Sequence, residues 1–175
     1  MMYLVDKRLV ELIENATEKA LIELFKNNEH YYYISLITTG EGLCPFSSAW
    51  SHEALEKASN GDEDERYYLK WAYDESPYFD YGGQFFGEVK KEFENRKEFL
   101  TEQNYLDEVE IRINSMEQAL MNLDMKGLFG KGEKRKSIVV NAEFMPPDYT
   151  NTLRAQRINP PEAIVEWLEE IAEME

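Results

Sequence analysis

The beginning of the chain has apolar residues at helical spacing. Leu9, Leu12, Ile13, Ala16, Ala20 and Leu24 recur at steps of three and four, with glutamates between them. Such a segment has one apolar face and one charged face, which is typical of an amphipathic helix packed on a core. The pattern predicts a long helix over residues 3–27.

Four later segments have the character of β-strands. They are residues 31–39, 43–51, 67–73 and 137–145. The first is aromatic and β-branched and stops at Gly40, as strands often do at a turn. Pro45 restricts the second to a sheet edge or to a strand start. The last contains the apolar run Ile138-Val139-Val140 and has the best strand pattern.

Helical spacing returns between and after these strands. A short helix is expected over residues 52–59, a helix after Gly82-Gly83, another from Asn104, and a C-terminal helix after Asn159. The helix after Gly82-Gly83 should bury Phe86, Val89, Phe93 and Leu100. Gly127 is well placed to cap the end of the helix that starts at Asn104. Asn159-Pro160-Pro161-Glu162 resembles a capping box that begins the last helix, with Ile164, Trp167, Leu168 and Ile171 facing inward.

The order of these elements predicts the fold class. We expect an α+β fold, a single domain over residues 1–175, with a mostly antiparallel sheet of three to five strands. Several helices should cover the sheet, including long N-terminal and C-terminal helices. A chain of 175 residues is also of the size that usually forms one domain.

Charge excludes several classes of partner. The chain has 19 Lys and Arg against 35 Asp and Glu, a formal net charge of −16 at pH 7. Nucleic acids and anionic membranes repel such a surface, so neither is an expected partner.

No apolar stretch reaches the roughly 20 residues of a membrane span, and no signal peptide pattern is present. The single Cys44 indicates a reducing compartment, so a cytoplasmic location is expected.

Two charged segments stand out. Asp62-Glu63-Asp64-Glu65 is typical of a solvated loop, and it also suits a patch that attracts a cationic protein. Its spacing does not match a calcium-binding loop. Residues 126–136 are basic and rich in glycine, and they predict a mobile, hairpin-like, solvated connection between a helix and a strand.

Catalytic and metal-binding patterns are absent from the sequence. Cys44 and His52 are close enough to meet across a turn, but no third group to orient them is evident, and a buried cysteine is the simpler interpretation. One cysteine and two histidines, His30 and His52, cannot form a structural zinc site. No catalytic, cofactor-binding or metal-binding residue is therefore assigned, and no cofactor is expected.

An aromatic stretch offers a candidate interface. Five of the eleven residues from Trp71 to Tyr81 are aromatic, which suits either the core or a recognition surface. Together with the acidic run, it supplies the candidate interface residues Trp71, Tyr73, Asp74, Tyr78, Asp62, Glu63, Asp64 and Glu65.

Four pieces of the chain carry a resemblance. They are Tyr31–Leu36, Leu69–Asp74 followed by Pro77-Tyr78, Leu123–Gly130, and Arg157–Pro161. In this order they resemble the bacterial domain-of-unknown-function family 4303, and they span nearly the whole chain. That family has no established activity. Some relatives lie in toxin–immunity gene neighbourhoods, which would imply a protein-binding, toxin-neutralising role.

Three functional hypotheses follow. The leading one is an immunity-like protein that binds a basic protein such as a toxin, because acidity, absent catalytic spacing and the resemblance agree. An alternative is an enzyme whose site is assembled from scattered carboxylates and His52. A further alternative is an oligomeric structural protein that uses the aromatic stretch as its interface. A deep pocket with converging acids or histidines would favour the enzyme.

Overall fold

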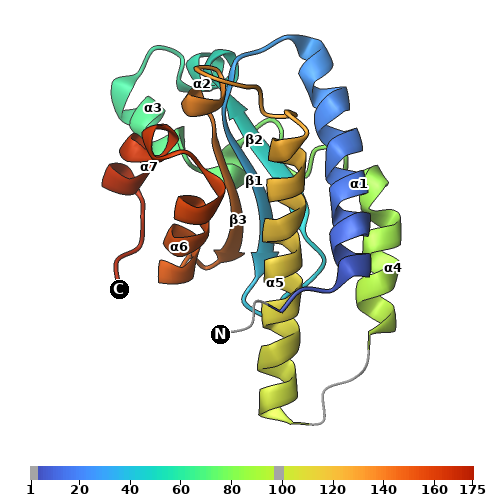
Figure 1. The fold of residues 1–175 in the computed structure, drawn as a ribbon. Coiled ribbons are helices and arrows are strands. Elements are labelled where there is room, and N and C mark those ends of the chain that lie inside the picture. Colours follow the sequence, from blue (N-terminus) through green and yellow to red (C-terminus); the bar gives the residue numbers. More distant parts are fainter. Residues whose placement is uncertain (1–3, 97–100) are drawn as a thin grey trace.

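A three-stranded sheet forms the centre of the computed structural model, which describes residues 4–96 and 101–175 (Figure 1). The middle strand is β1 (Tyr31–Thr39). On one side it pairs with β2 (Phe46–Ser51) in the antiparallel sense, and on the other with β3 (Val139–Met145) in the parallel sense. The α+β class and the three strands are as predicted. The sheet is mixed, however, rather than mostly antiparallel.

Helices cover both faces of this sheet. They are α1 (Lys7–Leu24), α2 (His52–Ser59), α3 (Glu63–Leu69), α4 (Gly87–Asn95), α5 (Glu102–Met125), α6 (Tyr149–Ile158) and α7 (Val165–Glu170). In Figure 1, α1, α4 and α5 lie on one side of the sheet, and α3, α6 and α7 lie on the other. Among the helices of the described residues, none is long and apolar enough to cross a membrane.

Two hydrophobic clusters fill the spaces between these layers. The larger cluster joins α1, α4 and α5 to the sheet through residues such as Ile34 and Val140. The smaller one contains Tyr33, Trp50 and Val139 and packs against Trp167 of α7. In β1, a register irregularity between Tyr31 and Tyr33 interrupts the alternation, and both Tyr32 and Tyr33 belong to the smaller cluster.

Side chains from the α6 region cover the outer edge of β3. The amide of Asn159 accepts from the N–H of Val140 at 2.8 Å and donates to its carbonyl at 2.6 Å. Asn151 does the same for Phe144 at 2.8 and 3.0 Å, and Arg154 donates to the carbonyl of Ala142 at 2.7 Å. An exposed row of backbone groups on an edge strand would otherwise need water or another chain.

Several local predictions are confirmed. The strand over residues 31–39 and the helix over 52–59 have the predicted bounds, and Pro45 directly precedes β2. Gly127 takes a left-handed conformation at φ 85° after α5. Its N–H donates to the carbonyl of Asp124, and the N–H of Leu128 donates to that of Leu123, as in a Schellman cap.

The predicted strand over residues 67–73 is wrong. Residues 63–69 form α3, and a 3-10 helix, η2 (Tyr73–Glu75), follows. Asp62 caps α3 by accepting from the N–H of Glu65 at 2.9 Å, and three acids fill the first turn. Negative charge at a helix N-terminus is favourable because the helix dipole is positive there. The acidic run therefore starts a helix instead of forming a loop.

The C-terminal prediction also needs correction. Asn159 does not begin the last helix as an N-cap, because its amide is used on β3 and the residue ends α6. A 3-10 helix, η5 (Pro161–Ala163), precedes α7. The C-terminal helices are short, with ten residues in α6 and six in α7. Ile164 and Trp167 are buried as expected, whereas Ile171 is 39% exposed. The expected burial of Leu100 lies outside the described residues.

The basic connection after α5 is not a hairpin, and part of it is buried. Phe129 lies in the larger core cluster, and Arg135 is 7% exposed. The guanidinium of Arg135 donates to Asp124 at 2.8 Å and to the side chain of Asn159 at 3.0 Å. The connection is therefore tied at both of its ends rather than fully solvated.

Candidate functional site

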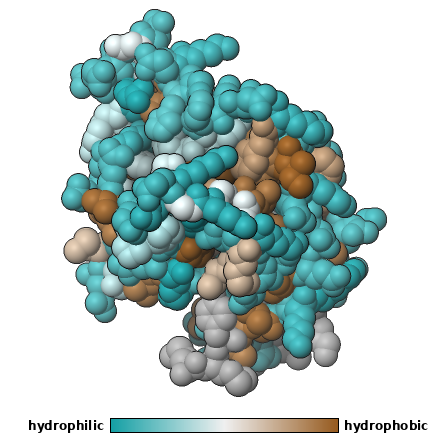
Figure 2. All heavy atoms as spheres, turned by 45° about the horizontal axis from the view of Figure 1, so that its top comes forward, coloured by the Kyte–Doolittle hydropathy of each residue, from teal (hydrophilic) through white to brown (hydrophobic). Residues whose placement is uncertain are grey.

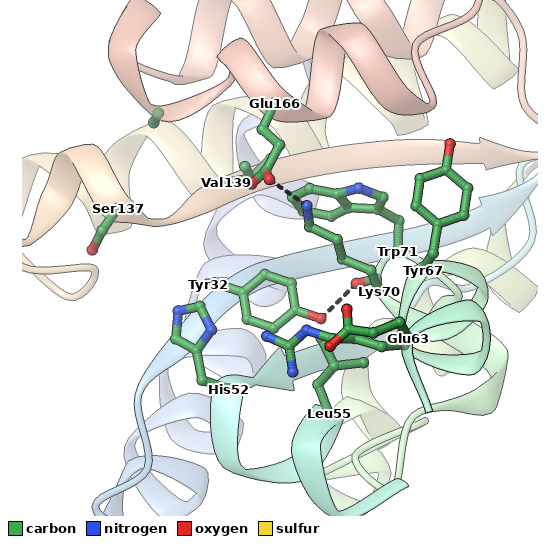
Figure 3. Close-up of a pocket in the computed structure, with 12 residues that line it drawn as sticks. Tyr32, His52, Leu55, Glu63, Tyr67, Lys70, Trp71, Ser137, Val139 and Glu166 are labelled. Atoms are coloured by element: carbon green, nitrogen blue, oxygen red, sulfur yellow. Dashed lines mark hydrogen bonds and ion pairs between the residues drawn. The ribbon is translucent and has the colours of Figure 1, made fainter. Parts of the chain in front are cut away.

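A cavity of about 490 Å³ lies at the end of the sheet where β1 and β3 begin (Figure 3). Its wall comes from α2, α3, the start of β3 and α7. The lining residues are Tyr32, His52, Leu55, Glu63, Arg66, Tyr67, Lys70, Trp71, Ser137, Val139, Ala163 and Glu166. These side chains meet because the strands end here and the short helices α2 and α3 fold back over them.

Tyr32 forms part of the floor of this cavity. Its hydroxyl donates to the carbonyl of Lys70 at 2.6 Å, and its ring contacts His52 and Trp71 at centroid distances of 4.8 and 5.5 Å. Burial raises the pKa of Tyr32 and lowers that of His52. Both side chains are therefore neutral at pH 7, which leaves His52 able to accept a proton.

Both cationic side chains of this cavity, Lys70 and Arg66, are paired with acids. The ammonium of Lys70 lies 2.6 Å from Glu166 and 2.9 Å from Glu170, and the indole N–H of Trp71 donates to Glu170 at 2.6 Å. Burial raises the pKa of Glu170, but these two donors hold it below its ordinary value. Arg66 is bound to Glu56 at 2.9 Å. These contacts tie α7 to α3 and leave little unpaired charge for catalysis.

A second cavity, of about 580 Å³, adjoins the first and shares His52 and Ser137 with it. It is also lined by His30, whose Nδ1 lies 2.5 Å from Oε1 of Glu53. Hydrogen bonds from the side chain and the backbone of His30 lower the pKa of Glu53 to about 2. Lys134 of the basic connection contributes to the opposite wall.

A third cavity, of about 280 Å³, lies on another side of Trp71, which lines the first cavity too. It contains Glu143, which is 5% exposed and accepts from the hydroxyls of Tyr33 and Ser35 at 2.6 and 3.0 Å. Burial raises the pKa of Glu143. A carboxyl group with a perturbed pKa at a cavity wall is a common feature of functional sites.

The predicted interface residues are placed in different surroundings. Trp71 is buried, and Glu63 lies beside it at the first cavity, whereas Tyr73 and Asp74 line the third. Tyr78 is half-buried, donates to Glu29 at 2.6 Å and lines neither of these two cavities. The remaining acids, Asp62, Asp64 and Glu65, are exposed around the start of α3. The structure thus gathers part of the predicted set around Trp71.

Cys44 and His52 do not form a pair. The charged groups that act on Cys44 include Lys90 and Glu94 of α4, and those that act on His52 include Glu53 and Arg66. Burial raises the pKa of the Cys44 thiol to about 11, so the thiol is protonated at pH 7. In residues 4–96 and 101–175, no three His, Cys, Asp or Glu side chains are grouped as metal ligands would be.

Sequence reasoning missed three features of this region. Tyr67 and Tyr68 are 66% and 67% exposed, and they lie on α3 and not on a strand. Glu143 was passed over inside the strand pattern, although an acid at an inward position of an apolar strand is an unusual signal. Trp167 was expected only as a core residue, and its unpaired indole N–H became visible only in three dimensions.

Comparison with known proteins gives one match. A family model described as a domain of unknown function (DUF4303) matches residues 13–160. No curated protein and no solved structure matches the chain. The matched segment contains all three strands and the helices α2 to α6, and it ends just before α7.

Proposed function

The chain belongs to the DUF4303 family, and we propose that it is a protein-binding module that recognises a basic protein through α3 and the adjoining cavity. One observation carries this proposal. Tyr67 and Tyr68 are each about two-thirds exposed, directly after the acidic first turn of α3. Tyrosine is frequent among residues that dominate binding energy in interfaces, and neither Tyr67 nor Tyr68 belongs to a hydrophobic cluster of the described residues.

The surroundings of α3 support a cationic partner. Glu63, Asp64 and Glu65 are exposed on α3, and the side chain of Glu166 on α7 is 65% exposed across the cavity. Figure 2, which brings the top of Figure 1 forward, shows a mostly hydrophilic surface with separate hydrophobic patches. On a surface of this type, acidic side chains speed the association with a basic partner, and a few aromatic side chains stabilise the complex.

The specific form of the proposal is an immunity-like protein that neutralises a basic toxin. The product of an adjacent gene is the partner to test, by calorimetry with the purified proteins. We expect a complex whose association slows as salt rises, because salt screens the attraction between exposed charges. Absence of binding to any adjacent gene product, and absence of protection in cells, would count against this function.

Variants of α3 provide the sharper test. Replacing Tyr67 and Tyr68 by Ala should weaken the complex by about thirtyfold or more, since even one hot-spot residue is worth about 2 kcal/mol. Ile22→Ala on α1 is the matched control, because Ile22 is 51% exposed on the other side of the sheet. Equal affinity for both variants would show that α3 is not the interface. A dimer of the free protein in light scattering would favour self-association instead.

A catalytic alternative has one observation in its favour. The neutral imidazole of His52 lies at the first cavity together with Glu63 and Glu166, which is the convergence expected of an acid–base site. Turnover of simple ester or phosphate substrates that is lost in His52→Ala would favour it. The pairing of Lys70 and Arg66 with other acids is the reason that binding is the preferred proposal.

A further inference from the structure

The third cavity differs from the first in its chemistry. Its lining residues come from the segment around η2, the end of β3, α6, α7 and the C-terminal segment. They include Trp71, Tyr73, Asp74, Glu143, Trp167 and Glu173. Three of these are acids, and no Lys, Arg or His of the described residues is among them. The negative charge at this cavity is therefore not balanced within its own wall.

Glu143 lies at the buried side of the cavity. Its Oε1 atom accepts from Tyr33 and Ser35, and burial raises the pKa of its carboxyl group. The nearest buried cation on α6, Arg154, donates instead to the carbonyl of Ala142 and to the side chain of Asn151. Within the described residues no ion pair joins Arg154 to Glu143, and the charge of Arg154 acts on the carboxyl group only through space.

Aromatic side chains form the rest of the wall. Trp71, Tyr73 and Trp167 all line the cavity. The faces of such rings attract cations, and tryptophan does so most strongly. Aromatic faces combined with a buried carboxyl group are a suitable environment for an organic ammonium ion, whose carbon atoms contact the rings while its N–H groups reach the acid.

Trp167 adds an independent sign of a ligand. The residue is 2% exposed, and its indole N–H has no hydrogen-bond partner among the described residues. The indole of Trp71, by contrast, donates to Glu170. A buried donor is normally satisfied, and Trp167 lines this cavity, so an acceptor atom of a bound ligand would supply the partner that this donor lacks.

We propose that this cavity binds an organic ammonium ion that carries a carbonyl group next to the charged nitrogen, as in an amino-acid amide or a peptide amino terminus. The ammonium group donates to Glu143 and lies against the rings of Trp71 and Tyr73. The carbonyl oxygen accepts from the indole N–H of Trp167. Asp74, which is exposed, attracts the cation at the cavity mouth. This site is separate from the α3 surface, and it stands whether or not a basic protein binds there.

The test is a calorimetric titration of the full chain with small probes. Glycinamide, which has both groups, should bind. Ethylammonium, which lacks the carbonyl, should bind about tenfold more weakly, and N-acetylglycinamide, which lacks the charge, should not bind measurably. Triglycine amide distinguishes a peptide amino terminus from a free small molecule as the natural ligand. Binding as tight as that of glycinamide indicates a peptide amino terminus, and loss of binding indicates a free small molecule.

Three variants connect the binding to the named residues. Glu143→Gln keeps the shape and removes the charge, and it should weaken glycinamide binding by about tenfold or more. Trp167→Phe keeps an aromatic ring and removes the N–H, so it should weaken glycinamide and leave ethylammonium unchanged. Glu169→Gln is the matched control, because Glu169 is exposed on α7 and does not line the cavity.

Several results would overturn the proposal. These are no binding of glycinamide, equal binding of N-acetylglycinamide, or equal losses in Glu143→Gln and Glu169→Gln. Circular dichroism of each variant establishes that it is folded. Should Glu143→Gln fail to fold, Asp74→Asn replaces it, since Asp74 is exposed and its loss should still weaken binding by a few-fold at low salt.

Discussion

Glu143 is the residue whose position conflicts most with its chemistry. It lies on β3 opposite Ile37 of β1, on the sheet face that carries the smaller core cluster. Burial disfavours the charged form and raises the pKa, while hydrogen bonds from Tyr33 and Ser35 act in the opposite direction. The folded protein therefore binds a proton at this position more tightly than the unfolded chain does.

This conflict predicts a stability effect in Glu143→Gln. Because the pKa of Glu143 is raised on folding, its contribution is intact below about pH 4.5 and is lost as pH rises through the folded pKa. Glutamine cannot ionise, so the Glu143→Gln variant does not lose this stability at high pH. We expect the variant to be more stable than the wild type by about 1 kcal/mol or more at pH 8, and equal to it near pH 4. Urea unfolding at both pH values measures the difference.

The control for this prediction is Glu173→Gln, an exposed acid at the same cavity. It should change stability little at either pH, because exposed side chains contribute little. A lower stability of Glu143→Gln at pH 8 would mean that the carboxylate is charged and compensated in the folded state.

Single residues were predictable where the reason was local. Gly127 caps α5 because its neighbours along the chain require a left-handed residue there, and the sequence contains that signal. Asn159 has an equally clear capping pattern, yet its amide serves β3, which is distant in sequence. Glu143 and Trp167 became candidates only when folding placed them at one cavity. Local signals cannot report such distant partners.

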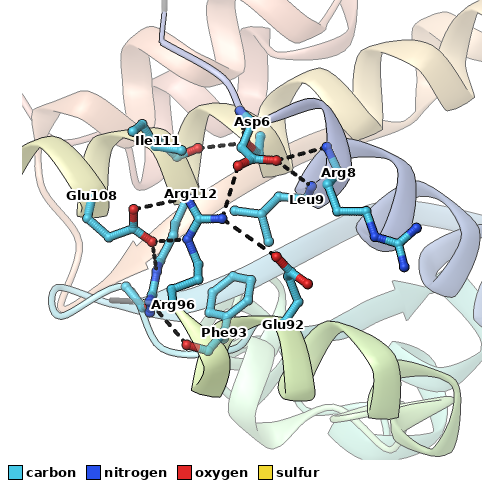
Figure 4. Close-up of polar contacts among 11 residues, drawn as sticks. Asp6, Arg8, Leu9, Glu92, Phe93, Arg96, Glu108, Ile111 and Arg112 are labelled. Carbon is cyan, nitrogen blue, oxygen red and sulfur yellow. Dashed lines mark hydrogen bonds and ion pairs between the residues drawn. The ribbon is translucent and has the colours of Figure 1, made fainter. Parts of the chain in front are cut away.

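At the scale of elements, one charged cluster joins three helices (Figure 4). Arg96, just after α4, binds Glu108 of α5 and also Asp6, which caps α1. Arg112 donates to Glu108 at 2.8 Å and to the carbonyl of Gly42 at 2.8 Å. Glu108 accepts from both arginines and is the centre of this cluster. It therefore orients α4 and α5 relative to the loop after β1.

Removing that acid should weaken the fold. Burial raises the pKa of Glu108, but hydrogen bonds from Arg96 and Arg112 outweigh it and lower the pKa overall. Its contribution is therefore present above about pH 4.5 and is lost as pH falls through the lower folded pKa. We expect Glu108→Gln to reduce the free energy of unfolding by about 2 kcal/mol at pH 7. Chemical denaturation gives this value.

Glu110→Gln is the matched control on the same helix, since Glu110 is exposed. It should differ from the wild type by less than about 0.5 kcal/mol. If both variants lose the same stability, the loss comes from the net charge or from helix propensity and not from the cluster.

Elements were predictable where length and pattern agreed. The strand over residues 31–39 and the strand ending at Met145 were found because they are apolar and bounded by turn residues. The strand prediction for residues 67–73 was wrong because Tyr and Trp favour strands, while the signal for a helix start, Asp62, lies upstream of that segment. The parallel pairing of β1 and β3 was not readable either, since strand direction depends on the path of the helices between them.

At the scale of the whole molecule, the net charge of −16 is a source of repulsion. Several acids are paired in clusters such as those of Lys70 and Arg96. The acids at the start of α3 are exposed and form no ion pair among the described residues. Like charges held close together in a compact state destabilise it relative to the expanded chain. The net negative charge is thus concentrated on particular parts of the surface, such as the start of α3.

Salt should therefore stabilise the protein. Raising sodium chloride from about 0.05 to 0.5 M should raise Tm by a few degrees at pH 8, because screening weakens repulsion between exposed acids. The triple variant with Gln at positions 63, 64 and 65 should show a smaller rise in Tm with salt, because fewer exposed acids remain for salt to screen. A Tm that falls with salt would mean that attractive pairs dominate. Differential scanning calorimetry measures both.

The parallel pairing of β1 with β3 sets an order of events during synthesis. Tyr33 pairs with Val139 and Thr39 with Met145, so the partner of the central strand emerges from the ribosome only after α5 has been made. Until then β1 can pair only with β2, and a two-stranded ribbon is marginal in water. The nascent chain must therefore keep an aromatic strand with one open edge until late in translation, and a chaperone that shields Tyr31–Leu36 would act in that interval.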